Sequence, residues 1–196
     1  MLAFALLAAP LAAEAQQPTH VPRLGFLSAA SADRDQPRLA GLQQGLHELG
    51  YVEGTTILIE RRYAAGQFAR LPDLAADLLH LQVDVLIAGD APAAQAAKEA
   101  TRTLPIVMAS VADPVGIVLV ASLARPGGNI TGLSDFNAGV VTKRLEFVKD
   151  VVPSASHIAV LLNPANPTNP LQWQLTQAAA PALRVTLLAL EATGAD

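Results

Sequence analysis

Two linked stretches near the middle of the chain constrain its fold more than any other feature. The first runs from Leu104 to Gly116, where an apolar segment rich in β-branched residues ends in a polar turn at Asp113-Pro114. A second apolar segment follows, and the stretch from Arg125 to Gly132 then interrupts it with Pro-Gly-Gly-Asn before a further short strand. Apolar runs bounded by turn residues in this order are typical of an α/β sheet whose strand ends carry a site.

The rest of the chain alternates in the same way between expected strands and expected helices. Leucines recur at helical spacing from Leu39 to Leu49, after a polar stretch from Ser28 to Pro37 that is expected to be a loop. Apolar strands that alternate with helices predict an α/β fold, with a mainly parallel sheet flanked by helices on both faces. Strands are expected at 21–27, 55–60, 83–88, 105–109, 129–133, 157–162 and 184–190, and helices at 39–49, 71–79, 92–101, 115–123, 140–151 and 170–180.

The order of these elements divides the chain into two α/β units. Residues 21–135 hold enough strands for a complete first lobe. Residues 138–196 hold too few strands and helices for an independent sheet, so this second, similar lobe is expected to be truncated.

The beginning of the chain has the character of an export signal. Residues 1–15 are almost wholly apolar and end in Ala13-Glu14-Ala15, a small-x-small cleavage pattern. The apolar part is shorter than the roughly 20 residues that span a bilayer, so a membrane anchor is the weaker alternative, and Pro10 disfavours a buried helix. No Lys or Arg follows Met1, so we expect the true start to lie upstream. The mature chain is then expected to be periplasmic, with no segment inserted in the membrane.

Charge and cysteine content narrow the classes of partner. A formal net charge of −4, with 15% charged residues, leaves no basic surface for nucleic acid. The sequence has no cysteine, which excludes lipid attachment at a cysteine and a thiolate metal site. We therefore expect the partners to be small molecules or proteins. We also expect a monomer, with no cofactor and no metal.

Candidate binding residues follow the expected strands. In open parallel sheets, ligands lie beyond the carboxyl ends of the strands, where helix N-termini point their N–H groups outward. Side chains in four such loops are expected to converge on one cleft. The candidate ligand-binding residues are Ser28, Asp90, Ser110, Asn163 and Asn166.

Each candidate also has a purely structural interpretation. Asp90 and Asp113 both precede a proline, so each could simply cap a helix. Ser28 could be a solvated loop residue, and the Asn-Pro pairs of residues 163–169 are ordinary turn formers. The glycines of residues 125–129 fit tight backbone geometry better than phosphate binding, because no helix follows them directly.

Catalytic patterns are absent from the sequence. The histidines are scattered, and no H-E-x-x-H, G-x-S-x-G or G-x-x-x-x-G-K-[ST] motif is present. We therefore expect a binding protein and not an enzyme. Two alternatives remain, an α/β enzyme acting on a nucleotide or sugar and the effector-sensing domain of a regulator. The first would need a phosphate loop or a base, and the second a helix-turn-helix before Val21, where an apolar leader stands instead.

The Asp-Pro-Val turn at 113–115 and the segment Arg-Pro-Gly-Gly-Asn-Ile-Thr-Gly at 125–132 resemble those of substrate-binding proteins of the tryptophan/tyrosine-type ABC uptake systems. The resemblance runs from about Val21 to the end of the chain. It implies the type 1 periplasmic-binding-protein fold and a small organic solute, an amino acid or an aromatic compound, delivered to an ABC permease. Many members of that family carry Gly-Thr where this chain has Asp90-Ala91, so a hydroxyl for binding an anion is missing there. The Asp90 carboxylate could instead hold a ligand's ammonium group.

Overall fold

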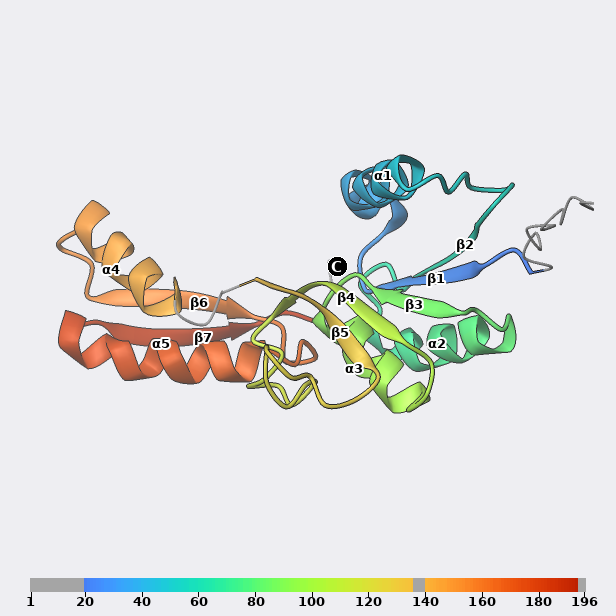
Figure 1. Cartoon of the computed structure of the whole chain (residues 1–196). Helices are drawn as coiled ribbons and strands as arrows, with labels where there is room; N and C mark the ends of the chain where they lie inside the picture. Colours follow the sequence, from blue (N-terminus) through green and yellow to red (C-terminus); the bar gives the residue numbers. More distant parts are fainter. Residues whose placement is uncertain (1–19, 136–139, 194–196) are drawn as a thin grey trace, which may run out of the picture.

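The computed structural model describes residues 20–135 and 140–193, which form two parallel sheets joined end to end (Figure 1). The first sheet has five strands in the order β2-β1-β3-β4-β5, and every neighbouring pair is parallel. The second pairs β6 with β7, also in parallel. The strands are β1 (Arg23–Ser28), β2 (Leu58–Tyr63), β3 (Val85–Ala88), β4 (Ile106–Ala112), β5 (Ile130–Asp135), β6 (His157–Leu162) and β7 (Thr186–Glu191), and the helices are α1 (Ala32–Glu48), η1 (Phe68–Arg70), α2 (Leu71–His80), α3 (Ala91–Ala100), α4 (Val141–Val151) and α5 (Asn169–Leu183).

Both faces of the five-stranded sheet are covered, because β1 alternates its side chains between two cores. Phe26, fully buried, packs with Leu39 of α1 on one face. Leu27, also fully buried, packs with residues of α2 and α3 on the other, where Leu78 lies. Figure 1 shows α1 on one side of this sheet and α2 and α3 on the opposite side. This arrangement matches the expectation of a parallel sheet flanked by helices, and it sets the carboxyl ends of the strands at one edge.

The first helix begins earlier than predicted. Residues 28–37 were expected to form a loop, but α1 starts at Ala32 and carries Pro37 within it. Ser31 holds the N-cap position. Asp33 and Asp35 place negative charges at the positive end of the helix dipole, where they stabilise the helix. The polar composition concealed this start, because most of the first two turns is exposed and only Asp35 is buried.

The helix predicted at 115–123 does not form. This segment forms turns and bends, and Val118 adopts a left-handed conformation with φ of 58°. Val115, Ile117 and Val118 are β-branched and form helices poorly. Leu119 and Val120 are buried in the same core cluster as residues of α2 and α3, so this irregular turn packs against the sheet in place of a helix.

The second sheet is covered on one face. Leu145 of α4, Ala180 of α5 and Val185 form a small buried cluster against it. On β6 and β7, Leu161 and Leu188 are 72% and 60% exposed. The chain therefore leaves one apolar face of this sheet open to solvent.

No helix in the described part of the chain is long and apolar enough to cross a membrane. The segment 1–15, expected to be a signal peptide, lies outside the described residues.

Candidate functional site

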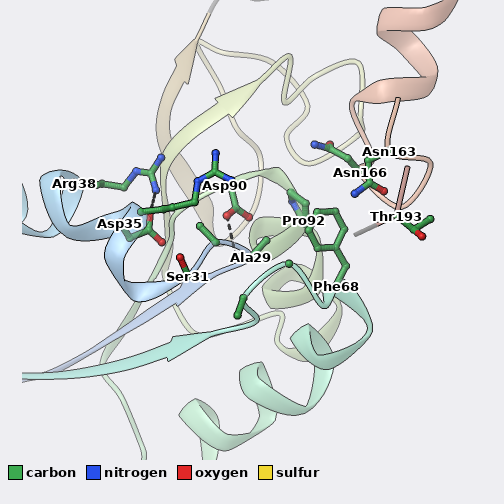
Figure 2. A pocket seen from close by; sticks show the side chains of 14 residues that line it. Ala29, Ser31, Asp35, Arg38, Phe68, Asp90, Pro92, Asn163, Asn166 and Thr193 are labelled. Carbon is green, nitrogen blue, oxygen red and sulfur yellow. Dashed lines mark hydrogen bonds and ion pairs between the residues drawn. The ribbon is translucent and has the colours of Figure 1, made fainter. Parts of the chain in front are cut away.

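A cavity of about 560 Å³ lies where the strand ends of the first sheet meet the loop between β6 and α5 (Figure 2). Its walls come from the start of α1, the turn after β2, the start of α3 and the loop after β6. Three of the predicted site residues, Asp90, Asn163 and Asn166, line it together. The topology therefore brings residues more than 70 positions apart to one cavity at the carboxyl ends of the strands.

Asp90 is held by three hydrogen bonds. Its Oδ1 accepts the N–H of Ala93 at 3.0 Å, which caps α3. Its Oδ2 accepts the Ser28 hydroxyl at 3.0 Å and the N–H of Ala29 at 2.9 Å. Both roles anticipated for this residue thus have a geometric basis, because the carboxylate caps a helix and also lines the cavity.

Ser28 contacts the cavity-lining residue Asp90 but does not itself line the cavity. Its side chain is fully buried, and it is not among the residues that line the cavity. Besides donating to Asp90, its Oγ accepts the N–H of Ala30 at 3.0 Å. The hydroxyl therefore fixes the turn between β1 and α1 and orients the Asp90 carboxylate.

Ser110 is not brought to this cavity. It was expected in a loop after a strand ending at Ala109, but β4 continues through Ala112. The register of β4 against β5 shifts between Met108 and Val111, and Ser110 lies at this irregularity. Its Oγ donates to Asp135 of the neighbouring strand at 3.3 Å. Asp113, the expected cap, does accept the N–H of Gly116 at 2.9 Å, but in a turn and not at a helix start.

Asparagine side chains within the loop between β6 and α5 hold its conformation by hydrogen bonds. Oδ1 of Asn163 accepts the N–H of Ala165 at 3.0 Å, and Oδ1 of Asn166 accepts the N–H and the hydroxyl of Thr168 at 3.0 and 2.8 Å. These are the turn-forming bonds that Asn-Pro sequences favour. They also hold both amides in the wall of the cavity.

The first turns of α1 supply charged groups that the sequence reasoning missed. Arg34, Asp35 and Arg38 all line the cavity. Asp35 is 1% exposed, and its Oδ1 pairs with Arg38. Its Oδ2 is buried without a hydrogen-bond partner in the described part of the chain. The run of alternating charges at Asp33-Arg34-Asp35, directly after a strand and an N-cap serine, was the signal that could have revealed this wall.

The apolar part of the wall is small. Phe68 of η1 is half-buried and Pro92 at the start of α3 is buried, and both line the cavity. Figure 2 shows the Phe68 ring between the two walls, on the same side as Pro92. A planar or apolar portion of a ligand has a surface to pack against here.

The charged end of β2 lies outside the cavity. Arg61 pairs with Glu53 at 2.7 Å. Although burial acts to raise the pKa of Glu53, hydrogen bonds from Gln43 and Arg61 hold it below its ordinary value. Burial raises the pKa of Tyr63, which is not among the residues lining the cavity. Within residues 20–135 and 140–193, no group of three or more His, Asp or Glu is placed to hold a metal ion.

Comparisons with known proteins identify the architecture. A structure described as a conserved domain protein from Vibrio cholerae superposes with a TM-score of 0.81 at 30% identity, covering 89% of this chain and 58% of that one. An ABC domain in complex with L-Trp from Streptococcus pneumoniae gives 0.79 at 28% identity, with the same two coverages. These matches confirm the predicted periplasmic-binding-protein-like α/β fold.

Sequence comparisons extend over most of the chain. A tyrosine-binding protein from Clostridioides difficile is 36% identical over 132 residues, which are 67% of this chain and 38% of that protein. The chain therefore spans little more than half the length of the similar structures and matches a smaller share of this relative. A family model for ABC transporter substrate binding proteins matches residues 26–194. The chain belongs to the ABC transporter substrate-binding protein family.

Proposed function

We propose that this chain is the solute-binding component of an ABC uptake system. It takes a small organic solute, an amino acid or an aromatic compound, in the cavity between the two sheets and presents it to a membrane permease. The observation that carries the proposal is the cavity itself, because polar side chains from both sheets' loops line it. A solute bound there contacts both units at once, and closure of the two units buries it.

The proposed ligand contacts are the residues that were predicted from the sequence and that also line the cavity, or support it, in the structure. Asp90, Asn163 and Asn166 bind the solute directly, and Ser28 acts through Asp90. Three of the roughly four acceptor directions of the Asp90 carboxylate are used, so one is left for an ammonium group. Ser110 remains a predicted contact that this cavity does not include.

Export and organisation belong to the same proposal. We infer a signal peptide at 1–15, a first lobe at 21–135 and part of a second lobe at 138–196, in a monomeric periplasmic protein. The Ala-x-Ala pattern before Gln16 supports cleavage there. Mass spectrometry of protein from the periplasmic fraction should give a mature chain that begins near Gln16, and an intact leader on a cytoplasmic product would contradict the inference.

Ligand binding is tested by thermal shift and calorimetry on the full chain. The panel holds L-tryptophan, L-tyrosine, other amino acids, aromatic acids and, for the enzyme and regulator alternatives, nucleosides and sugars. A true ligand at 100 times its Kd stabilises the folded state by about 2.7 kcal/mol. Stabilisation by an amino acid or aromatic acid supports the proposal, and a response to nucleosides or sugars alone would replace it.

A further inference from the structure

Arg34 is a cation in the cavity wall that has no partner among the described residues. It lies in the first turn of α1, and its side chain is exposed to the cavity that it lines. In the described part of the chain, no hydrogen bond or ion pair involves its guanidinium. A positive charge at a helix N-terminus is unfavourable for the helix itself by about 0.3–1 kcal/mol. Arg34 therefore makes no stabilising contact with the described part of the fold, and its five N–H donors can bind a ligand.

The other charged side chains of the cavity each have at least one partner, although Oδ2 of Asp35 has none among the described residues. Arg38 pairs with the buried Asp35, and Asp90 accepts three hydrogen bonds from neutral donors. Among the described residues that line this cavity, Arg34 is the cation that has no anionic partner. Ser31 at the N-cap makes no side-chain bond to the helix, so its hydroxyl does not cap the N–H groups of the first turn of α1 beside Arg34.

The facing wall also presents donors. Figure 2 shows Asn163 and Asn166 across the cavity from Asp35 and Arg38. Because Oδ1 of each asparagine accepts backbone N–H groups of its own loop, Nδ2 is the free branch of each amide. Within the described residues, neither Nδ2 donates to the protein. Donors from both sheets' loops thus line one cavity, with a full positive charge on one side only.

We propose that Arg34 binds the carboxylate of the solute, with the amides of Asn163 and Asn166 closing on the same ligand from the second unit. Guanidinium is suited to this role because its planar fork matches the two oxygens of a carboxylate. The inference rests on the proposed function and deepens it, since it makes Arg34 the residue that selects organic acids over their neutral amides. The Asp90 carboxylate, which has no cationic partner within residues 20–135 and 140–193, then remains for the ammonium of an amino acid.

The test compares each acid with its carboxamide on the full chain by calorimetric titration. The probes are L-tryptophan with L-tryptophanamide and L-tyrosine with L-tyrosinamide. The wild-type protein should prefer the acid by about ten- to a hundredfold, the size of one charge-assisted hydrogen-bonded contact. Arg34→Gln should bring this ratio close to one, and Arg34→Lys should keep part of it. Arg102→Gln, the same change at an exposed residue outside this cavity, should leave the ratio unchanged.

The outcomes separate this inference from the proposed function. If Arg34→Gln leaves the acid preference intact, or weakens acid and amide equally, Arg34 is not the carboxylate-binding residue although the solute-binding function stands. Equal wild-type affinity for acid and amide would overturn the inference in the same way. If the wild-type chain binds none of the four probes, the amino-acid form of the proposed function fails and this inference fails with it. Circular dichroism checks that each variant folds.

Discussion

Ser28 and Asp90 are joined by a hydrogen bond of 3.0 Å although 62 residues separate them in the chain. The same carboxylate accepts the N–H of Ala29 and caps α3 through Ala93. One side chain thus ties the turn after β1 to the start of the helix after β3. This carboxylate therefore links two walls of the cavity.

Asp90→Ala should destabilise the fold. It removes the cap of α3, worth about 1 kcal/mol, and leaves the fully buried Ser28 hydroxyl without its acceptor, worth about 1–3 kcal/mol. The free energy of unfolding measured in urea should fall by about 2–4 kcal/mol. Asp73→Ala is the control, because Asp73 is an exposed aspartate in the first turn of α2, and its loss should cost less than about 0.5 kcal/mol.

Titration of the Asp90→Ala variant with L-tryptophan addresses its second role. Loss of a charge-assisted bond to a ligand ammonium should weaken binding by roughly 1.5–3 kcal/mol. Reduced stability with unchanged affinity would restrict Asp90 to holding the fold.

The fold was largely predictable because its signals are local. The strands β1, β3 and β4 are apolar runs bounded by turn residues, and the buried leucines of α2 recur at helical spacing. The charged strand β2 lies at 58–63, three residues later than the predicted 55–60. The helix predicted at 115–123 was wrong. This segment is as apolar as a buried helix, but an irregular turn buries Leu119 and Val120. Hydrophobic periodicity does not distinguish a helix from an irregular turn that packs against a sheet.

The site was predictable only in part. Asp90, Asn163 and Asn166 could be found from their place after strands, since the strand-end rule needs no side-chain geometry. Arg34 and Asp35 were missed, because their stretch was expected to be a loop and their contacts depend on where α1 begins. Ser110 was expected in a loop because β4 was predicted to end at Ala109, whereas β4 continues to Ala112 past a register shift that has no local sequence signal.

Gly132→Ala should disrupt the edge of the first sheet. Gly132 lies in β5 with φ of 136°, opposite Met108 of β4, and an added Cβ would collide with the Met108 backbone. Both the strained conformation and the collision act against the variant, so the free energy of unfolding should fall by more than about 1 kcal/mol. Gly128→Ala provides the matched control, since nothing lies within 4 Å of a Cβ there. Equal stability of the two variants would show that β5 does not pair closely at this point.

Asp84 should make stability depend on pH in the acid range. The backbone N–H of Arg23 at 2.7 Å, and then the His20 ring, hold the pKa of Asp84 below its ordinary value of 3.8. A folded-state pKa below the unfolded one stabilises the protein above the unfolded value, and this stabilisation is lost as the pH falls through the folded value. Wild type should therefore be more stable than Asp84→Asn at pH 7, and this difference should shrink below about pH 4 in denaturation curves. A difference that persists undiminished at pH 2 would mean that the hydrogen-bond geometry, and not the charge, stabilises the fold.

The second sheet should respond very differently to truncation on its two faces. Leu145 of α4 is 4% exposed within the cluster that covers one face, so Leu145→Ala should lower the free energy of unfolding of this unit by about 2–5 kcal/mol. Leu161 of β6 is 72% exposed on the other face, and Leu161→Ala removes the same atoms from a site where water already reaches them. Its cost should stay within about 0.5 kcal/mol.

Tryptophan fluorescence of Trp173, which lies in α5 of the second unit, follows the unfolding of this unit during denaturation. If Leu161→Ala proved as costly as Leu145→Ala, the second face would be covered in solution by some other surface, because only burial makes the loss of a leucine side chain expensive.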